Sequence, residues 1–394
     1  IAGTGRPGPV LIDIPMDVQK SVIDFEYPEK CEIRSYKPTT KGNYVQVRRV
    51  MAALEEAEKP LICIGGGVFA AHAENEIREL ADLMQIPVIT TMMGISVFPD
   101  DDPLFCGMIG THGVKMANAA VNECDVLFLV GARVGDRAVK TPLALEKTTK
   151  IIHIDIDPAE IGKNIGADLP LVGDAKLVLQ QMTELAKPMK HDEWIAHIKT
   201  LGGERKYVEP AKGTVNPRVF IDRLAKKMPA NVTVVADVGQ NQIWTCTEYK
   251  FRKEGRLLTS GGMGTMGYSV PAAIGAKMAD NSRATVAICG DGAFQMSFME
   301  LATAVQFGVD IKVVVMTNNR LGMVRELQTN GYHDRQTAVF LDGSPDFIKL
   351  AEAYGIPAMR VYDDDTMEKG VEMLAEHKGI CLVEVVVDKD MPTL

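Results

Sequence analysis

This 394-residue sequence lacks several features that would indicate a membrane protein or a nucleic-acid-binding protein. No apolar stretch is long enough to span a bilayer, and we find no signal peptide. No basic run is present, and the net charge of −9 is the opposite of what a nucleic-acid surface needs. We therefore expect a cytoplasmic protein whose partners include neither a membrane nor a nucleic acid.

Metal-binding patterns built from cysteine or histidine are also missing. The seven cysteines are widely scattered without a CxxC pair, and the seven histidines form no HExxH motif. Several cysteines lie inside apolar stretches, which favours buried, reduced thiols. With 46% hydrophobic and 24% charged residues, the composition is that of an ordinary globular protein with room for two or three domains. The sequence begins at Ile1 rather than methionine, so we expect that a preceding segment is missing.

Strands rich in β-branched residues alternate with stretches of helical period over most of the chain. This pattern predicts an α/β fold with two doubly wound parallel-sheet domains, residues 43–189 and 217–394. The polar segments 21–42 and 190–216 are predicted linkers, the second with Trp194 on a short helix. Residues 1–20 contain one predicted apolar strand, 10–14, which cannot be stable alone, so we interpret them as the remnant of a further domain.

In the first of these domains, glycine and polar residues follow the ends of successive predicted strands. The predicted strands are 60–64, 88–91, 126–130 and 150–156, and the predicted helices are 44–57, 73–84 and 175–187. Because the carboxyl ends of parallel strands meet at one edge of a sheet, these residues outline a nucleotide-sized crevice. Taken singly, each is more often a turn glycine, a helix cap or a loop histidine. The GxGxxG fingerprint is absent, so ordinary NAD binding is not supported.

The second domain is organised around residues 290–319, which run GDGAFQMSFMELATAVQFGVDIKVVVMTNN. Apolar stretches predict buried strands at 284–289 and 311–316, with a helix at 298–307 between them. This unit places Asp291 and Asn318 side by side at the carboxyl ends of neighbouring strands. A GDG alone is usually an ordinary turn. One carboxylate and one amide oxygen nevertheless suit Mg²⁺ that also keeps water and phosphate oxygens, so the implied ligand is a Mg²⁺-diphosphate.

The rest of this domain surrounds that unit. A helix at 217–227 and a strand at 232–236 come first, and a glycine loop then precedes a helix that begins near Pro271. The N-terminus of that helix is a predicted phosphate site. Residues 321–341 are predicted to be mobile, and a helix at 346–354 and a strand at 381–387 follow.

Seven motifs resemble, in the same order, those of acetolactate synthase (acetohydroxyacid synthase) catalytic subunits. They are GRPGPVLIDIP, VGARVGDR, IDIDPAEIGKN, DVGQNQIW, GGMGTMGYSVPAAIGAK, the GDG-to-NN unit and GMVRELQ. The resemblance covers nearly the whole chain. It implies an N-terminal pyrimidine-binding domain, a central FAD-associated domain and a C-terminal thiamin-diphosphate-binding domain, of which the first survives here only as residues 1–20.

The resemblance implies three cofactors, thiamin diphosphate, Mg²⁺ and FAD, and assigns residues to each. The metal ligands would be Asp291, Asn318 and the carbonyl of Arg320. The thiamin diphosphate contacts would be Gly239, Gln240, Asn241, Gly264, Met266, Gly290, Asp291, Gly292, Ala293, Asn318, Gly322 and Met323. The FAD contacts would be Gly65, Gly66, Gly67, Thr90, Thr91, Gly110, His112, Gly131, Arg133, Arg137, Asp155 and Asp174. The substrate pocket would be lined by Met323, Val324 and Leu327, although core filling is the other interpretation of Met266 and Met323.

The implied activity is decarboxylation of pyruvate and carboligation to a second 2-oxo acid. The product would be 2-acetolactate or 2-aceto-2-hydroxybutyrate, at the first common step of branched-chain amino acid biosynthesis. The glutamate that activates the cofactor lies in the family's N-terminal domain, so we expect no catalytic residue in this chain and no activity from it alone. The implied partners are further copies of the chain, as a homodimer or homotetramer, and a small regulatory subunit. A tail that covers the site in the family is expected to be lost after Leu394.

The chain departs from the family pattern at three places. Asn241 stands where the family usually has histidine, so only a backbone contact there would survive. Leu327 replaces a tryptophan that favours 2-oxobutyrate as acceptor, from which we expect pyruvate to be both donor and acceptor. The motif VGARVGDR lacks the aromatic-acidic pair usual before its final Asp-Arg, which weakens the case for FAD.

Two other interpretations stay open. A 2-oxo acid decarboxylase or a pyruvate oxidase would share the GDG-to-NN unit, because this unit marks the cofactor and not the acceptor. A non-catalytic nucleotide-binding module is consistent with the missing first domain. Product identity separates the enzymes, and cofactor binding without turnover would indicate the module.

Overall fold

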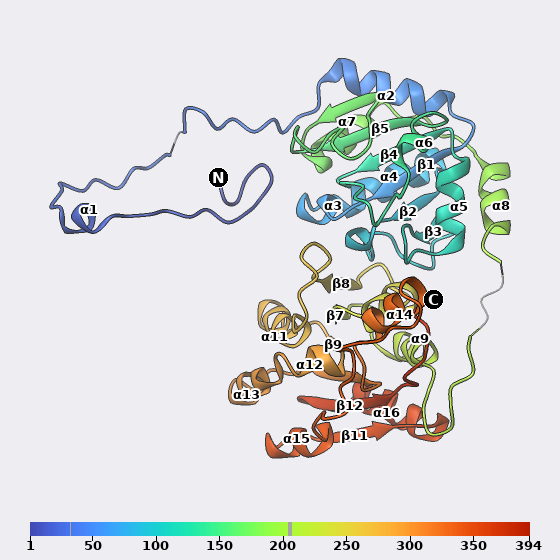
Figure 1. Cartoon of the computed structure of the whole chain (residues 1–394). Coiled ribbons are helices and arrows are strands. Elements are labelled where there is room, and N and C mark those ends of the chain that lie inside the picture. Colours follow the sequence, from blue (N-terminus) through green and yellow to red (C-terminus); the bar gives the residue numbers. More distant parts are fainter. Residues whose placement is uncertain (32, 204–206) are drawn as a thin grey trace.

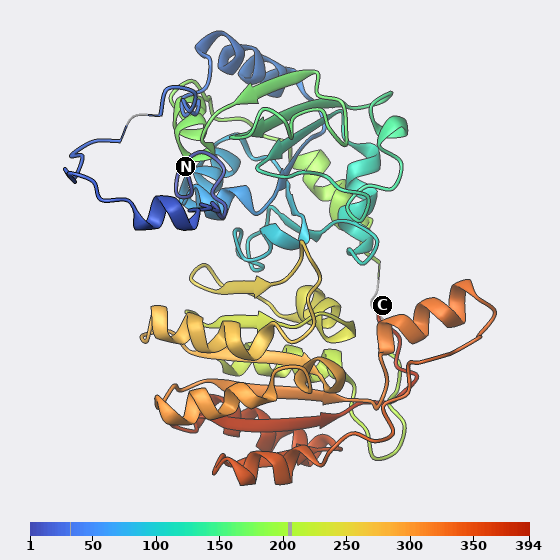
Figure 2. The same cartoon turned by 60° about the vertical axis from the view of Figure 1, so that its left-hand side comes forward.

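The computed structural model describes residues 1–31, 33–203 and 207–394, so residues 32 and 204–206 of the two predicted linkers lie outside the described residues. Two α/β domains are stacked one above the other, and an N-terminal arm extends from the upper, central domain (Figure 1). Each domain contains one six-stranded parallel sheet with helices on both faces (Figure 2). The predicted fold class of two doubly wound parallel-sheet domains is confirmed.

The central domain has the strand order β3-β2-β1-β4-β5-β6, in which every neighbouring pair is parallel. Its strands are β1 (Pro60–Ile64), β2 (Val88–Thr90), β3 (Phe105–Met108), β4 (Val126–Val130), β5 (Lys150–Asp155) and β6 (Leu169–Val172). Its helices are α2 (Tyr44–Glu56), α3 (Gly67–Ala70), α4 (Glu74–Met84), η1 (Met92–Gly94), α5 (Lys115–Glu123), α6 (Pro142–Leu145), α7 (Ala175–Thr183) and α8 (Asp192–Thr200). This is the strand order of dinucleotide-binding sheets, whose direction of winding reverses between β1 and β4.

Alternate residues of β1 pack into different cores. Ile62 and Ile64 of β1 share a core with α2, α4 and α7, whereas Leu61 and Cys63 share a second core with α5 and α8. Burial on both faces explains why this strand reads as an unbroken apolar run. Helix α8, which carries Trp194 and lies inside the predicted linker 190–216, belongs to the second of these cores.

The C-terminal domain has the order β11-β12-β10-β9-β7-β8, again all parallel. Its strands are β7 (Thr233–Ala236), β8 (Arg256–Thr259), β9 (Thr285–Gly290), β10 (Lys312–Thr317), β11 (Ala358–Val361) and β12 (Cys381–Val386). Its helices are α9 (Pro217–Lys227), α10 (Gln240–Glu248), α11 (Ser269–Ala279), α12 (Asp291–Phe294), η2 (Phe298–Glu300), α13 (Leu301–Gln306), α14 (Gly322–Gly331), α15 (Phe347–Ala353) and α16 (Asp364–Glu376). The winding reverses between β7 and β9, where a ligand crevice is expected at the carboxyl edge.

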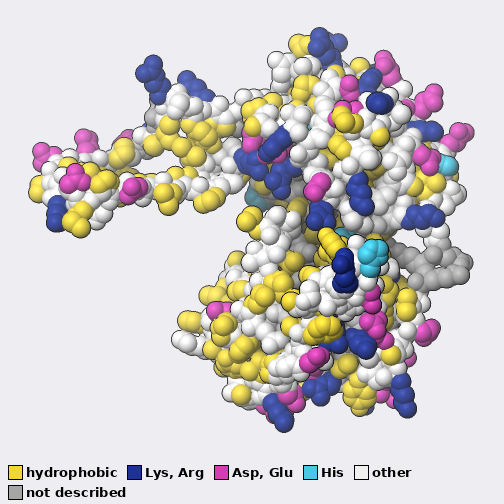
Figure 3. All heavy atoms as spheres, in the orientation of Figure 1, with side chains coloured by type: hydrophobic (Ala, Val, Ile, Leu, Met, Phe, Trp, Pro, Cys, Tyr) yellow, Lys and Arg dark blue, Asp and Glu magenta, His cyan; other side chains and the backbone are white. Residues whose placement is uncertain are grey.

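The N-terminal arm corrects the prediction of a strand at residues 10–14. These residues are coil, and Leu11 is 93% exposed, because no neighbouring strand in the described chain supplies backbone hydrogen bonds. A short helix, α1 (Met16–Lys20), follows instead. Figure 3 shows the hydrophobic side chains spread along this arm. Near the N-terminal end of the arm, Arg6 forms ion pairs with Asp157 (3.0 Å) and Glu160 (2.7 Å) of the central domain.

Two further predictions concern the C-terminal domain. The stretch 321–341, predicted to be mobile, contains the ten-residue helix α14 and a bridge between Arg320 and Phe340. Helix α11 begins at Ser269, near Pro271 as predicted, and the proline lies in its first turn.

The structure also answers the predictions about thiols and membranes. Six of the seven cysteines are buried and Cys31 is exposed, all as free thiols. Burial raises the pKa of the Cys63 thiol to about 12, which keeps it protonated. Within the described residues, no helix combines the length and the apolar character needed to cross a membrane.

Candidate functional site

Asp291 and Asn318 lie side by side, as predicted, because β9 and β10 are neighbouring parallel strands with Gly290 opposite Met316. Asp291 is buried, with only 2% of the residue exposed. Its Oδ2 accepts hydrogen bonds from the backbone amides of Asn318 (3.1 Å) and Asn319 (2.6 Å). Its Oδ1 accepts one from the amide of Gly292 (2.8 Å). The carboxylate is therefore fixed at the carboxyl edge of the sheet, beside the switch point.

The Asp291 carboxylate has no positive partner among the described residues. Burial raises its pKa to about 6, and the three amides only partly oppose this shift. A buried carboxylate of this kind is stabilised by a bound cation. No group of three His, Cys, Asp or Glu side chains in the described part of the chain could hold a metal. One carboxylate with nearby amide and carbonyl oxygens remains, a donor set that fits Mg²⁺ bound together with water and phosphate.

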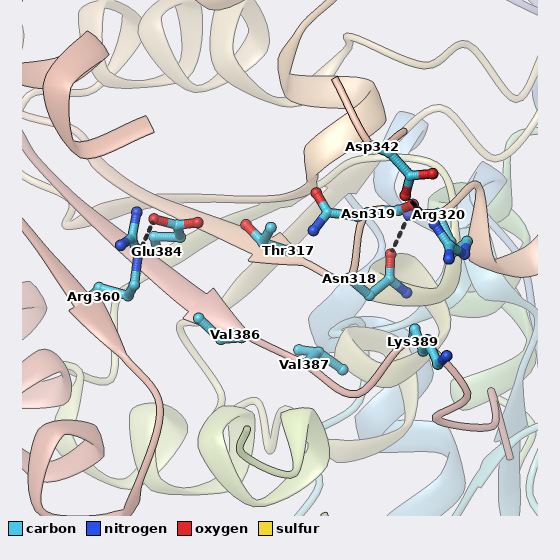
Figure 4. Close-up of a pocket in the computed structure, with 10 residues that line it drawn as sticks. All are labelled: Thr317, Asn318, Asn319, Arg320, Asp342, Arg360, Glu384, Val386, Val387 and Lys389. Carbon is cyan, nitrogen blue, oxygen red and sulfur yellow. Dashed lines mark hydrogen bonds and ion pairs between the residues drawn. The ribbon is translucent and has the colours of Figure 1, made fainter. Parts of the chain in front are cut away.

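Asn318 is oriented by two neighbours. Its Oδ1 accepts a hydrogen bond from the amide of Arg320 (3.1 Å), and its Nδ2 donates to Oε1 of Gln240 (3.3 Å). Figure 4 shows Asn318 turned toward Arg320 at the rim of a cavity of about 450 Å³. The cavity lies between the ends of β10 and β12 and is lined by Thr317, Asn318, Asn319, Arg320, Asp342, Arg360, Glu384, Val386, Val387 and Lys389.

The segment after β7 brings three predicted cofactor residues to the same edge. Gly239 has φ 140°, a backbone conformation that favours glycine, and it precedes α10. The Gln240 side chain lies over Gly322, where an added Cβ would fall 1.9 Å from Gln240 Oε1. Asn241 is buried, and its Nδ2 donates to the carbonyls of Asp237 (2.8 Å) and Ile288 (3.2 Å). Its side-chain amide nitrogen is thus committed to joining β7 and β9.

Some of the remaining predicted cofactor and substrate residues lie beside Asp291, and others lie on α14 or in the loop after β8. Met266 reaches the GDG turn, since an added Cβ on Gly292 would lie 3.5 Å from Met266 Cε. Gly290 and Ala293 flank Asp291 directly, and Gly264 lies in the loop after β8. Three residues occupy α14: Met323, which is partly buried, and Val324 and Leu327, which are 45% and 58% exposed.

The N-terminus of α11, where a phosphate site is predicted, is capped by Asp237. Asp237, which is fully buried, occupies this helix end, where it accepts hydrogen bonds from the amides of Gly267 (3.0 Å) and Ser269 (2.8 Å). A third bond comes from the amide of Val238 (2.8 Å). These amides already have a negative partner, so they do not offer an anion site.

The predicted FAD residues all follow strands at the carboxyl edge of the central sheet. Gly65 to Gly67 follow β1, Thr90 and Thr91 lie at the end of β2, and Gly131 and Arg133 follow β4. The others are placed along the same edge: Gly110 and His112 after β3, Arg137 beyond β4, Asp155 at the end of β5 and Asp174 after β6. Those after β1 and β4 flank the switch point, where this strand order binds dinucleotides, whereas those after β3 and β6 lie at the outer strands.

Several of these residues also have structural roles. A Cβ on Gly65 would lie 2.1 Å from the carbonyl oxygen of Gly131, so backbone contact alone requires glycine there. Asp174 caps α7 by accepting from the amide of Leu177 (3.1 Å). Arg133 and Arg137 are exposed, whereas the buried Thr90 hydroxyl has no hydrogen-bond partner in the described structure. His112 is half-buried, and burial lowers the pKa of its imidazole.

Both domains match models of one enzyme class. Residues 237–385 match "Thiamine pyrophosphate enzyme, C-terminal TPP binding domain", and residues 47–182 match "Thiamine pyrophosphate enzyme, central domain". The fold is thus that of the central and C-terminal domains of a thiamine pyrophosphate enzyme, and Asp291 and Asn318 lie within the second of these domains. Among curated proteins, the chain is 41% identical over 402 residues to the "Probable acetolactate synthase large subunit" of Methanocaldococcus jannaschii, covering 98% of this chain and 68% of that protein.

Two further relatives carry the same name. The "Acetolactate synthase" of Arthrospira platensis is 40% identical over 407 residues, covering 99% of this chain and 69% of that protein. The "Acetolactate synthase large subunit" of Corynebacterium glutamicum is 40% identical over 372 residues, covering 92% of this chain and 59% of that protein. The chain belongs to the acetolactate synthase large-subunit family, and it spans roughly two thirds of the length of these relatives.

Proposed function

We propose that this chain forms the central and cofactor-binding domains of an acetolactate synthase. The reaction is thiamin-diphosphate-dependent decarboxylation of pyruvate with carboligation to a second 2-oxo acid, giving 2-acetolactate or 2-aceto-2-hydroxybutyrate. This is the first common step of branched-chain amino acid biosynthesis. The observation that carries the proposal is the buried Asp291 carboxylate, without a positive partner in the described chain, beside Asn318 at the switch point. The family membership supports it.

The residues of this chain bind and orient. Asp291, Asn318 and the Arg320 carbonyl hold Mg²⁺, and the glycine-rich backbone at 239–241 and 290–293 admits the diphosphate close to the main chain. Bound thiamin diphosphate supplies the ylid and the electron sink. Met266, beside the GDG turn, supports the cofactor from its apolar side, and Met323 lines the substrate pocket with Val324 and Leu327. We assign no proton transfer to a side chain of the described residues, because the activating glutamate belongs to the family's N-terminal domain.

FAD is the second cofactor that we propose, for the carboxyl edge of the central sheet. The strand order and the row of glycine and polar residues at that edge support it. Arg133 and Arg137, which are exposed there, are the two cations of the predicted set that can pair with a diphosphate. Retention of flavin absorbance after gel filtration tests this assignment, and its loss in Arg133→Ala and Arg137→Ala chains would localise it.

The assembly that we propose is a homodimer or homotetramer, with a small regulatory subunit as a further partner. Sedimentation of the chain with and without a separately expressed N-terminal third tests the self-association. A decarboxylase or a pyruvate oxidase is the alternative on the same scaffold, because the metal site does not select the acceptor.

Product analysis tests the function directly. The chain is incubated with pyruvate, thiamin diphosphate, Mg²⁺ and FAD, alone and with the N-terminal third of a relative added in trans. Acetolactate formed only with the added segment is the expected result. Acetaldehyde or acetyl phosphate would indicate the alternative enzymes, and acetolactate from the chain alone would overturn the placement of the activating glutamate.

A further inference from the structure

A chain of hydrogen bonds runs from Glu326 on α14 to the proposed metal site. Gln240 Nε2 donates to Glu326 Oε2 (3.2 Å), and Gln240 Oε1 accepts from Asn318 Nδ2 (3.3 Å). Asn318 Oδ1 is thereby turned away from Gln240 and accepts from the amide of Arg320 (3.1 Å). Three side chains from α10, α14 and the end of β10 are thus linked end to end.

Glu326 determines which end of each side-chain amide donates and which accepts along this series of hydrogen bonds. An ionised carboxylate only accepts hydrogen bonds, whereas a side-chain amide has one donating and one accepting end. Glu326 therefore requires the Nε2 end of Gln240, and the Oε1 end must face Asn318. The same rule then turns Nδ2 of Asn318 toward Gln240 and leaves its oxygen for other partners. A carbonyl oxygen has two lone pairs, so Oδ1 can accept from the Arg320 amide and still ligate a cation.

Gly322 gives this arrangement its room. A Cβ at position 322 would lie 1.9 Å from Gln240 Oε1 and 3.0 Å from Asn318 Nδ2. Any side chain there would push the two amides apart. The residue four positions later on the same helix, Glu326, then reaches Gln240 from the other side.

Thr393 and Met391 also form hydrogen bonds with Glu326 and Gln240. Glu326 Oε2 accepts from the amide of Thr393 (3.0 Å) and from its hydroxyl, and Gln240 Nε2 also donates to the carbonyl of Met391 (2.9 Å). The Met391 carbonyl is an acceptor only, so it favours the same orientation of Gln240. Loss of the Glu326 charge should therefore weaken the orientation without abolishing it.

We propose that Glu326 is a positioning residue for the metal: acting through Gln240, it fixes the side-chain amide of Asn318 so that Oδ1, and not Nδ2, is presented as a ligand. The inference rests on the proposed Mg²⁺ site at Asp291 and Asn318. It concerns a residue of the GMVRELQ motif that belongs neither to the predicted metal ligands nor to the predicted substrate pocket.

The test is Mg²⁺ affinity measured by isothermal titration calorimetry on the 394-residue chain in saturating thiamin diphosphate. Glu326→Gln, which keeps the shape but can donate as well as accept, should weaken Mg²⁺ binding about fivefold. The thermal unfolding midpoint of the metal-free chain should stay the same. Thr393→Val is the matched control: it removes the hydroxyl that donates to Glu326 and accepts from Gln240 Nε2 (3.2 Å), but it keeps the Glu326 carboxylate and the Met391 carbonyl that orient Gln240, and it should change the affinity by less than about twofold.

The same Glu326 substitution in an Asn318→Asp chain separates an effect on the orientation of residue 318 from an effect of charge or packing. In an Asn318→Asp chain both ligand atoms are oxygens, so orientation no longer matters, and Glu326→Gln should leave Mg²⁺ affinity unchanged or improve it. An equal loss in both backgrounds, or no loss in either, would overturn the proposal. Wild-type chain that binds no Mg²⁺ with thiamin diphosphate would instead overturn the proposed function, and this inference with it. A Glu326→Ala chain repeats the comparison should Glu326→Gln prove unstable.

Discussion

The backbone amide of Asn319 donates a 2.6 Å hydrogen bond to Oδ2 of Asp291, a residue 28 positions earlier. This bond joins the ends of β9 and β10 and fixes the carboxylate at the edge where parallel strands present ligand sites. It also leaves the negative charge of Asp291 buried without a positive partner in the described chain. The charge is the feature from which a metal site follows, and it makes binding depend on pH.

Magnesium affinity should fall as the pH is lowered through about 6. Burial raises the pKa of Asp291 from 3.8 to about 6, and the ligand must be ionised to bind metal. Calorimetric titration between pH 5 and 8 should give constant affinity above about pH 7 and roughly a tenfold loss per pH unit well below 6. An affinity that is flat across this range would show that Asp291 is not the ligand.

The raised pKa of Asp291 also affects the stability of the metal-free chain, which should fall as the pH rises, whereas magnesium affinity should increase. A carboxyl whose folded pKa is raised contributes stability that is fully present below pH 3.8 and is lost as the pH rises through about 6. Asp291→Asn should remove this part of the pH dependence in metal-free unfolding curves. The control is the wild-type chain with saturating Mg²⁺ and thiamin diphosphate, in which binding offsets the loss.

Asp237→Ala should destabilise the C-terminal domain by about 2–4 kcal/mol, because three backbone amides lose a buried, charged acceptor. Urea unfolding of the metal-free chain measures the change. Asp280→Ala is the matched control: this exposed aspartate accepts hydrogen bonds from Ser282 on the surface, and its loss should leave the unfolding curve nearly unchanged. Equal costs for the two variants would contradict the role given to Asp237.

Gly65→Ala should destabilise the central domain by about 3 kcal/mol or more even without FAD. The new Cβ would lie 2.1 Å from the carbonyl oxygen of Gly131, and a backbone contact cannot be relieved by a rotamer change. Gly135→Ala, in the same region but with nothing within 4 Å, should be neutral within about 0.5 kcal/mol. Thermal unfolding of flavin-free protein compares them, and a stable Gly65→Ala chain would leave cofactor contact as the reason for that glycine.

Leu327→Trp should raise the preference for 2-oxobutyrate over pyruvate as acceptor several-fold. Leu327 is 58% exposed on α14, so a larger aromatic ring has room to cover the extra methylene, which is worth about 1–3 kcal/mol in an apolar pocket. The measurement is product ratio under competition in the reconstituted enzyme. Leu143→Trp, at an exposed leucine of α6, is the control, and an unchanged ratio in both would remove Leu327 from the substrate pocket.

The buried middle of each sheet could be predicted from the sequence, and its edges could not. Strands β1, β4, β9 and β10 are unbroken apolar runs because both of their faces are covered, and their predicted positions are within one residue of those found. Strands β3, β6, β8 and β11 have only four residues each, and β3 contains a glycine, β6 a proline and β8 and β11 an arginine, so no period is visible. At residues 10–14 a strand was predicted where none is found, because an apolar stretch becomes a strand only beside another strand.

The site divides in the same way. Asp291 and Asn318 were predictable because parallel neighbours bring successive strand ends together. The roles of Asp237 and Glu326 were not, because their partners Ser269 and Thr393 are 32 and 67 residues away and no spacing in the sequence pairs them. Helix α14 was missed because it begins and ends with glycine and is only partly buried.

The most direct test of the account is binding of thiamin diphosphate to the wild-type chain and to Asp291→Asn, with and without Mg²⁺, followed by calorimetry. We predict that binding to the wild-type chain requires Mg²⁺ and is reversed by a chelator, whereas Asp291→Asn folds but binds at least about tenfold more weakly at any Mg²⁺ concentration. Binding that is equally tight without Mg²⁺, or unaffected by Asp291→Asn, would contradict the assignment of this site.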